Sequence, residues 1–141
     1  EDEDFSLDLD REQDWFEGDI LYTDKQIIFG VETTELSTLQ NLLKSFKNLT
    51  KDNFNLWIEH LKTFAAEKLT DLANRWLKET GVTTPMITQK SFAYRIKITS
   101  IILFDDERFC IYFDDDDMFC GHAITVYGNL NGELEEVTIE G

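Results

Sequence analysis

The chain has 141 residues, of which 42% are hydrophobic and 13% aromatic, and its charged side chains give a formal net charge of −16 at pH 7. A chain of this length and hydrophobic content can bury a core, which excludes an intrinsically disordered protein and predicts a single domain over residues 1–141. The negative charge excludes nucleic acid and anionic membranes as partners, because binding phosphate requires a basic surface.

The N-terminal segment is the most acidic part of the chain. Eleven acidic residues and one base, Arg11, lie within residues 1–24. Such a start is unlike the cationic, apolar beginning of a secretory signal peptide, and no apolar run approaches the roughly 20 residues that span a bilayer, so we expect a cytoplasmic protein. We expect residues 1–19 to be partly flexible, with Trp15 and Phe16 anchoring the segment to the core.

The first predicted elements are strands. Residues Phe5–Leu9 alternate apolar and polar side chains with the period of two that is typical of a strand. Two further apolar runs, Ile20–Tyr22 and Gln26–Val31, are separated by a short polar turn. We therefore expect an N-terminal strand followed by a hairpin.

Two amphipathic helices are predicted next. Leu36, Leu39 and Phe46 recur at helical spacing after Thr34, whose hydroxyl can cap a helix N-terminus. A longer apolar and aromatic stripe begins near residue 50 and ends before Gly81, which can terminate a helix. Aromatic residues at this spacing indicate a core rather than a cofactor site.

The last third of the chain predicts four strands joined by turns. They are Arg95–Phe104, Arg108–Phe113, His122–Gly128 and Glu133–Ile139. The first becomes apolar on both faces, which is typical of a strand inside a sheet. The predicted fold class is α+β, with N-terminal strands, two amphipathic helices and a C-terminal four-stranded antiparallel meander, the helices packing on one sheet face.

The most unusual local sequence is the acidic run Asp114–Asp117, which precedes His122. Carboxylates and imidazoles bind divalent metals, so one hypothesis is a metal-binding domain or metal-dependent enzyme that uses Asp115, Asp117 and His122. The spacing does not match an EF-hand loop, and successive residues of a strand point to opposite faces, which favours a solvated hairpin turn without a metal.

Other catalytic signatures are missing from the sequence. It contains no phosphate-binding glycine loop, nucleophile elbow or His-Glu-x-x-His motif. Cys110 and Cys120 lie ten positions apart, without the spacing of a zinc site, and we expect two free thiols. We therefore expect a protein that is not an enzyme and that carries no cofactor.

The acidic run leads into Phe119-Cys120-Gly121-His122. This pattern resembles a family of small bacterial proteins of unknown function, in which an acidic turn precedes a Phe-x-Gly-His segment near the C-terminus. The resemblance implies that Gly121 and His122 are family features, and that the protein is an immunity-type inhibitor that neutralises a toxin. The chain departs from the family pattern at Cys120, where the resemblance implies a large aromatic residue.

Charge and resemblance together predict an intracellular binding protein. An acidic surface binds a basic partner with fast, electrostatically steered association, and nuclease toxins are commonly basic because they hold nucleic acid. We expect a basic protein partner such as a cognate toxin; the alternative is a DNA-mimic inhibitor of a DNA-binding protein. The residues expected to contact the partner are Asp14, Glu17, Asp19, Asp105, Asp106, Glu107, Asp114, Asp115, Asp116 and Asp117.

Overall fold

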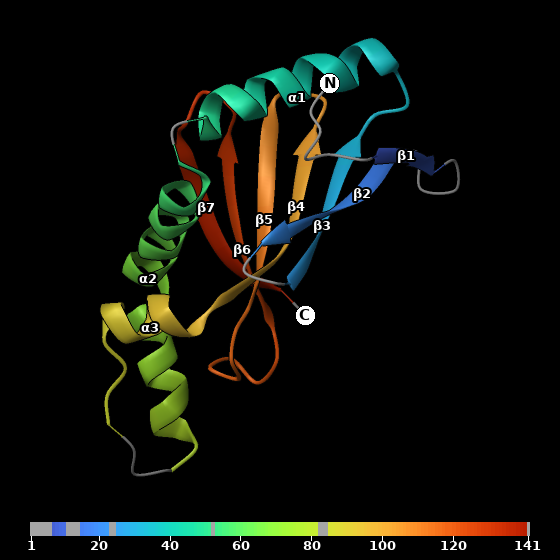
Figure 1. Ribbon diagram of the computed structural model, residues 1–141. Helices are drawn as coiled ribbons and strands as arrows, with labels where there is room; N and C mark the ends of the chain where they lie inside the picture. The colour runs from blue at the N-terminus through green and yellow to red at the C-terminus, as the bar shows by residue number, and fades with distance from the viewer. Residues whose placement is uncertain (1–6, 11–14, 23–24, 52, 82–84, 141) are drawn as a thin grey trace.

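The computed structural model describes residues 7–10, 15–22, 25–51, 53–81 and 85–140 of the chain (Figure 1). The elements in these ranges are β1 (Leu7–Asp10), β2 (Trp15–Tyr22), β3 (Lys25–Glu32), α1 (Leu36–Thr50), α2 (Phe54–Glu79), α3 (Gln89–Arg95), β4 (Lys97–Phe104), β5 (Arg108–Asp114), β6 (Ala123–Asn129) and β7 (Leu134–Glu140). The three described helices thus separate the first three strands from the last four.

The described strands form one mixed sheet. Their spatial order follows the sequence from β1 to β7. Every neighbouring pair is antiparallel except β3 and β4, which are parallel, with Phe29 opposite Ile101. Parallel strands need a long crossover connection, and α1, α2 and α3 supply it.

The predicted α+β class holds, but the predicted arrangement is wrong. β4 to β7 are consecutive antiparallel neighbours, yet they do not form a separate four-stranded meander, because the parallel β3–β4 pair joins them to the N-terminal strands in one seven-stranded sheet. Had β3 and β4 stayed unpaired, two apolar strands would each present an edge of free backbone groups, and their pairing removes both edges.

Helix α3 was not predicted from the sequence. It begins with a capping box, in which the Thr88 hydroxyl accepts from the Ser91 N–H at 3.0 Å and the Ser91 hydroxyl accepts from the Thr88 N–H at 3.0 Å. The approach to it is fixed by Asn74 of α2, whose amide bonds both the backbone N–H and the carbonyl of Ile87. Seven residues are too few to show a helical period in the sequence.

The acidic stretch around Trp15 belongs to strand β2, which begins well before the predicted start at Ile20. Phe16 packs against the hydrophobic core, as expected. The side chain of Trp15 lies on the other face of the strand, because neighbouring strand residues alternate. The expected flexibility of residues 1–19 concerns in part residues 1–6 and 11–14, which lie outside the described part of the chain.

One face of the sheet packs against the helices. Phe29 of β3 contacts Phe46 of α1 with ring centroids 5.4 Å apart, and Phe109 of β5 contacts Trp57 of α2 at 5.6 Å. The strand residues fully or almost fully buried on this face are Ile27, Phe29, Val31, Ile101, Leu103, Phe109, Ile111, Phe113, Ile124 and Val126. The two predicted amphipathic helices are therefore confirmed as the cover of the core.

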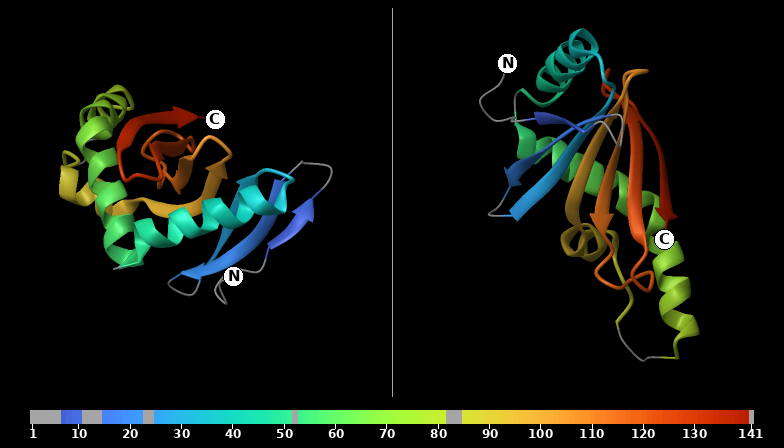
Figure 2. Two further views of the ribbon diagram at one scale, coloured as in Figure 1. Left: turned by 90° about the horizontal axis from the view of Figure 1, so that it is seen from above. Right: turned by 90° about the vertical axis from the view of Figure 1, so that its right-hand side faces the viewer.

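The described helices lie on one side of the sheet. α1 crosses one end of it, and α2 runs along it with α3 beside its lower half (Figures 1 and 2). We call the side of the sheet opposite the helices the open face. It carries partly exposed apolar residues such as Ile28, which is 44% exposed. None of the described helices is long and apolar enough to cross a membrane.

Candidate functional site

The loop between β5 and β6 is organised by a buried carboxylate. Asp115 is only 2% exposed; its Oδ1 accepts from the N–H of Asp117 at 3.0 Å, and its Oδ2 accepts from the N–H groups of Phe119 at 2.9 Å and Gly121 at 3.0 Å. These bonds hold a backbone that repeatedly enters the left-handed region, at Asp116, Asp117, Cys120 and Gly121. Asp115 thus has a structural role inside the loop.

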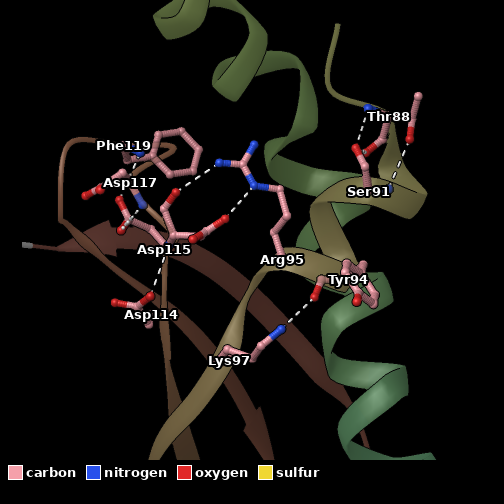
Figure 3. Close-up of polar contacts among 10 residues, drawn as sticks. Thr88, Ser91, Tyr94, Arg95, Lys97, Asp114, Asp115, Asp117 and Phe119 are labelled. Atoms are coloured by element: carbon pink, nitrogen blue, oxygen red, sulfur yellow. Dashed lines mark hydrogen bonds and ion pairs between the residues drawn. The ribbon is translucent and has the colours of Figure 1, made fainter. Parts of the chain in front are cut away.

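The end of α3 also fixes this loop (Figure 3). Arg95 donates from Nε to a carboxylate oxygen of Asp116 at 2.7 Å and from Nη2 to the carbonyl of Asp116 at 2.9 Å. The Asp116 N–H in turn donates to the carboxylate of Asp114 at 3.1 Å. Two of the acidic side chains expected to meet a partner are therefore engaged within the protein.

In the Phe-x-Gly-His segment that follows, the two ring side chains pack against α2. Phe119 is fully buried, and its ring lies 5.3 Å from that of Trp76 in α2. The ring of His122 meets the same indole edge-on at 5.7 Å, and its Nδ1 is hydrogen-bonded to the carbonyl of Phe119. The geometry therefore gives both aromatic positions of the motif a packing role.

The same contacts bear on the hypothesis of a metal site at Asp115, Asp117 and His122. Both oxygens of Asp115 accept backbone N–H groups, and the His122 ring packs on Trp76. Within the ranges that the structure describes, no group of three or more His, Cys, Asp or Glu side chains is placed to hold a metal ion. The metal hypothesis finds no support in this geometry.

The second acidic turn, Asp105–Glu107, lies at the other end of β5. Its backbone is held by a bond from the N–H of Leu130 to the carbonyl of Glu107 at 2.8 Å. We call residues 115–122, between β5 and β6, the Asp115 loop. The Asp105–Glu107 turn and this loop are separated by the seven residues of β5, which extend over roughly 20 Å. The structure thus places the two acidic turns at opposite ends of the sheet (Figure 1) and does not bring them together.

The remaining predicted contact residues belong to the N-terminal region. Glu17 and Asp19 lie on β2 and face Gly30 and Ile28 of β3 across the ladder, on the open face. Asp14 lies outside the described residues.

The open face is strongly acidic. Directly opposed residues of neighbouring strands share a face, so the register assigns its members. The acidic residues at open-face positions of the described strands are Asp8, Asp10, Glu17, Asp19, Glu32, Asp114, Glu136 and Glu140. The basic residues at such positions are Lys97 and Arg108, of which Arg108 is ion-paired with Glu135 at 3.0 Å.

An apolar groove of about 420 Å³ lies within this acidic surface. It extends over β3, β4 and β5 and is bounded by Trp15 of β2. Its lining residues are Trp15, Glu17, Ile28, Glu32, Ser100, Ile102, Phe104, Cys110 and Tyr112. The open face therefore combines an aromatic and aliphatic centre with surrounding carboxylates, and we take it as the candidate binding site.

Trp15 forms one side of the groove because β3 has a glycine beneath it. A Cβ atom at Gly30 would lie 2.8 Å from the indole ring, and 3.2 Å from the end of Ile102. The bare backbone at Gly30 lets the indole lie close to the sheet. The Trp15 Nε1 group donates to the carboxylate of Glu17 at 3.1 Å, which fixes that carboxylate beside the ring.

Three side chains in or near the groove, Cys110, Tyr112 and Tyr127, have raised pKa values. Burial raises the pKa of the Cys110 thiol to about 11, and burial together with the neighbouring Cys110 raises the pKa of Tyr112 to about 12. A hydrogen bond to Glu140 at 2.7 Å, followed by burial, raises the pKa of Tyr127. Cys110 is consequently a buried, unreactive thiol at neutral pH.

The groove residues other than Glu17 were not predicted from the sequence. One available signal was the composition of β4, which is apolar on both faces, so that Ile102 and Phe104 supply a second apolar surface besides the core-facing one. Another was Gly30 inside an apolar strand, because such a glycine often marks a close approach by another group.

Comparison with known proteins agrees with the bacterial resemblance and leaves the immunity role unassigned. No similar protein was found among curated proteins, and none among solved structures. The family described as "uncharacterized protein conserved in bacteria (DUF2262)" has a model that matches residues 2–139. The chain belongs to this family of uncharacterized bacterial proteins.

Proposed function

We propose that this protein binds and neutralises a basic partner protein, as an immunity-type inhibitor does with a toxin, and that the open face is the docking surface. The observation that carries the proposal is the combination on this face of a carboxylate rim with an apolar, aromatic groove. Stable interfaces have this anatomy, with aromatic anchors at the centre and polar groups around them. The proposal requires binding and no catalysis.

The negative charge of the open face favours a basic partner protein. The open-face positions of the described strands carry eight acidic and two basic residues, and the whole chain carries −16. A basic protein is attracted over about one Debye length, roughly 8 Å at physiological ionic strength, and its encounter is accelerated. A second copy of this chain is repelled by the same field.

Only some of the predicted contact residues lie on the proposed docking surface. Glu17, Asp19 and Asp114 lie at open-face positions. Asp115 is buried and bonded inside its loop, so it supports the fold instead of meeting a partner. The Asp105–Glu107 turn lies at the end of the sheet, where its charge contributes to steering at a distance.

The proposal is tested by capturing partners with two variants of equal charge. In the open-face variant, Asp8, Asp19 and Glu136 are replaced by Lys; in the control, the exposed Glu67, Asp71 and Glu79 of α2 are replaced by Lys. Tagged wild type and both variants are incubated with an extract of the source bacterium, and the bound proteins are identified by mass spectrometry.

We expect a basic protein that is retained by the wild type and by the α2 control and lost from the open-face variant. Raising NaCl to about 0.5 M should release it, because salt screens exposed charges. Expression of that protein should be toxic, and co-expression of the wild type, but not of the open-face variant, should restore growth. Equal retention by both variants, or rescue by both, contradicts the proposal.

A further inference from the structure

The groove on the open face is shaped for a small group rather than for a whole helix. Ligand pockets commonly occupy about 300–1,000 Å³, and this groove lies near the lower limit at about 420 Å³. Ile102 and Cys110 are buried and form its floor, while Trp15, Phe104 and Tyr112 are half-buried and form its sides. A single long side chain fits such a space better than a bulky element does.

The walls of the groove suit a cation. The faces of Trp, Tyr and Phe rings attract ammonium and guanidinium groups, and Trp does so best. Two carboxylates, Glu17 and Glu32, line the groove from neighbouring strands, and no Lys or Arg is among its lining residues. The bond from Trp15 Nε1 to Glu17 holds one ring and one carboxylate in place before any ligand arrives.

The charge of the groove comes from those two carboxylates. Cys110 and Tyr112 are neutral at pH 7, since the pKa of the thiol is about 11 and that of the phenol about 12. An apolar side chain from a partner would remove water from Glu17 and Glu32 without replacing its hydrogen bonds, which is unfavourable. A positively charged, planar group satisfies both the rings and the carboxylates.

We infer that the groove binds one arginine side chain that projects from the basic partner. The flat guanidinium stacks against aromatic faces and donates several hydrogen bonds to carboxylates, whereas the compact ammonium of lysine cannot do both equally well. This inference rests on the proposed function for the source of the arginine, and it adds the anchor residue that the partner must supply.

The inference is tested with short peptides as probes. The ¹⁵N-labelled protein is titrated with acetyl-Gly-Gly-Arg-Gly-Gly-amide and with the same peptide carrying Lys, citrulline or Leu in place of Arg. The indole N–H signal of Trp15, assigned with a Trp15→Phe variant, reports occupancy. We expect saturable shifts with the Arg peptide, binding about tenfold weaker with Lys, and no shifts with citrulline or Leu.

Two variants check the location. Glu17→Gln combined with Glu32→Gln should weaken the Arg peptide about tenfold or more, because two charge-assisted hydrogen bonds are lost. Ile28→Arg places a guanidinium at an exposed position of the groove lining and should also abolish binding by occupying it. Glu67→Gln combined with Asp71→Asn on α2 is the matched control and should bind normally.

Binding of the Leu or citrulline peptide as tightly as the Arg peptide, or unchanged binding to the Glu17→Gln, Glu32→Gln protein, overturns the inference. Its failure is separable from failure of the proposed function. If the partner is captured through the open face but its arginines can be replaced singly without loss, only the inference fails. If the Arg peptide binds the groove while partner capture is unaffected by the open-face variant, the proposed function fails and the groove keeps its preference for arginine, but the captured partner is not the source of that arginine.

Discussion

The Asp115 loop and the open face are both rich in carboxylates, yet they use them in opposite ways. In the loop, the oxygens of Asp115 are consumed by three backbone N–H groups, and Asp116 is held by Arg95. On the open face, Glu17 and Glu32 line a groove without any basic neighbour in its lining. Local acidity therefore does not identify a binding site; the partners of each carboxylate do.

The first prediction concerns Phe119, the residue that anchors the Asp115 loop to the core. Phe119→Ala removes a fully buried ring that packs on Trp76, and we expect the free energy of unfolding to fall by about 3–5 kcal/mol. Urea denaturation followed by circular dichroism measures this fall. A loss below about 1 kcal/mol would show that the motif does not anchor the loop to the core.

The second prediction concerns the buried carboxylate itself. Asp115→Ala leaves three backbone N–H groups without their acceptor, and we expect a destabilisation of about 2–4 kcal/mol. The exposed Asp117, replaced by Asn, is the control and should change stability by less than about 0.5 kcal/mol. Equal effects of the two substitutions in the same urea titration contradict the structural role of Asp115.

The third prediction turns to the groove. Gly30→Ala places a Cβ atom against the Trp15 ring, and we expect a destabilisation of about 1–3 kcal/mol from overpacking. The displaced indole should also lose its hydrogen bond to Glu17, which moves its ¹H–¹⁵N signal. Ser100→Ala, which removes a hydroxyl from the same groove, is the control. An unmoved indole signal in Gly30→Ala would place Trp15 elsewhere.

The fourth prediction uses pH. The folded pKa of Cys110, about 11, lies above its ordinary value of 9.0 because of burial, so the folded state keeps a proton that the unfolded state loses. Stability should therefore be full below pH 9 and fall between pH 9 and 11, by about 1–2 kcal/mol for this group. Tyr112, raised in the same direction, adds to the fall at higher pH.

Urea titrations of wild type and Cys110→Ala at several pH values measure this effect. The variant should lose stability less steeply above pH 9, and the buried thiol of the wild type should resist alkylation at pH 8 while Cys120 reacts. Identical pH slopes for the two proteins would mean that the thiol is not desolvated.

The smallest effect is expected on the open face. Asp19→Asn removes an exposed carboxylate from an acidic surface, and the free energy of unfolding should change by less than about 0.5 kcal/mol or rise slightly as repulsion is relieved. A large loss of stability, comparable with that of Asp115→Ala, would mean that the open-face carboxylates stabilise the fold, as Asp115 does, and would contradict the difference between the two regions.

The sequence predicts the local elements better than their assembly. Leu39, Leu42 and Phe46 mark α1 because a helix repeats its buried positions, and the apolar faces of β4 mark an interior strand. Which strand lies beside β4 depends on a pairing with β3 across about seventy residues, and a period of two carries no information about that partner.

The site was harder to predict for a related reason. Asp114 to Asp117 are four identical side chains in a row, and only the left-handed turn selects Asp115 as the buried acceptor. Likewise, the sequence predicts both Trp15 and Phe16 as core anchors. Because β2 begins at Trp15, the two side chains lie on opposite faces of the sheet, so that Phe16 packs against the core and Trp15 lines the groove. Residue types were visible in the sequence, whereas the face that each one occupies required the register.

The central claim is that a partner docks on the open face and not on the acidic turns. Chemical-shift mapping of the ¹⁵N-labelled protein with the captured basic partner tests it most directly. We predict that the perturbed signals cluster at Trp15, Glu17 and Glu32, while those of Asp105–Glu107 and Asp115–Asp117 stay unchanged. Perturbations confined to the two turns, with an unmoved Trp15 indole signal, would contradict the account.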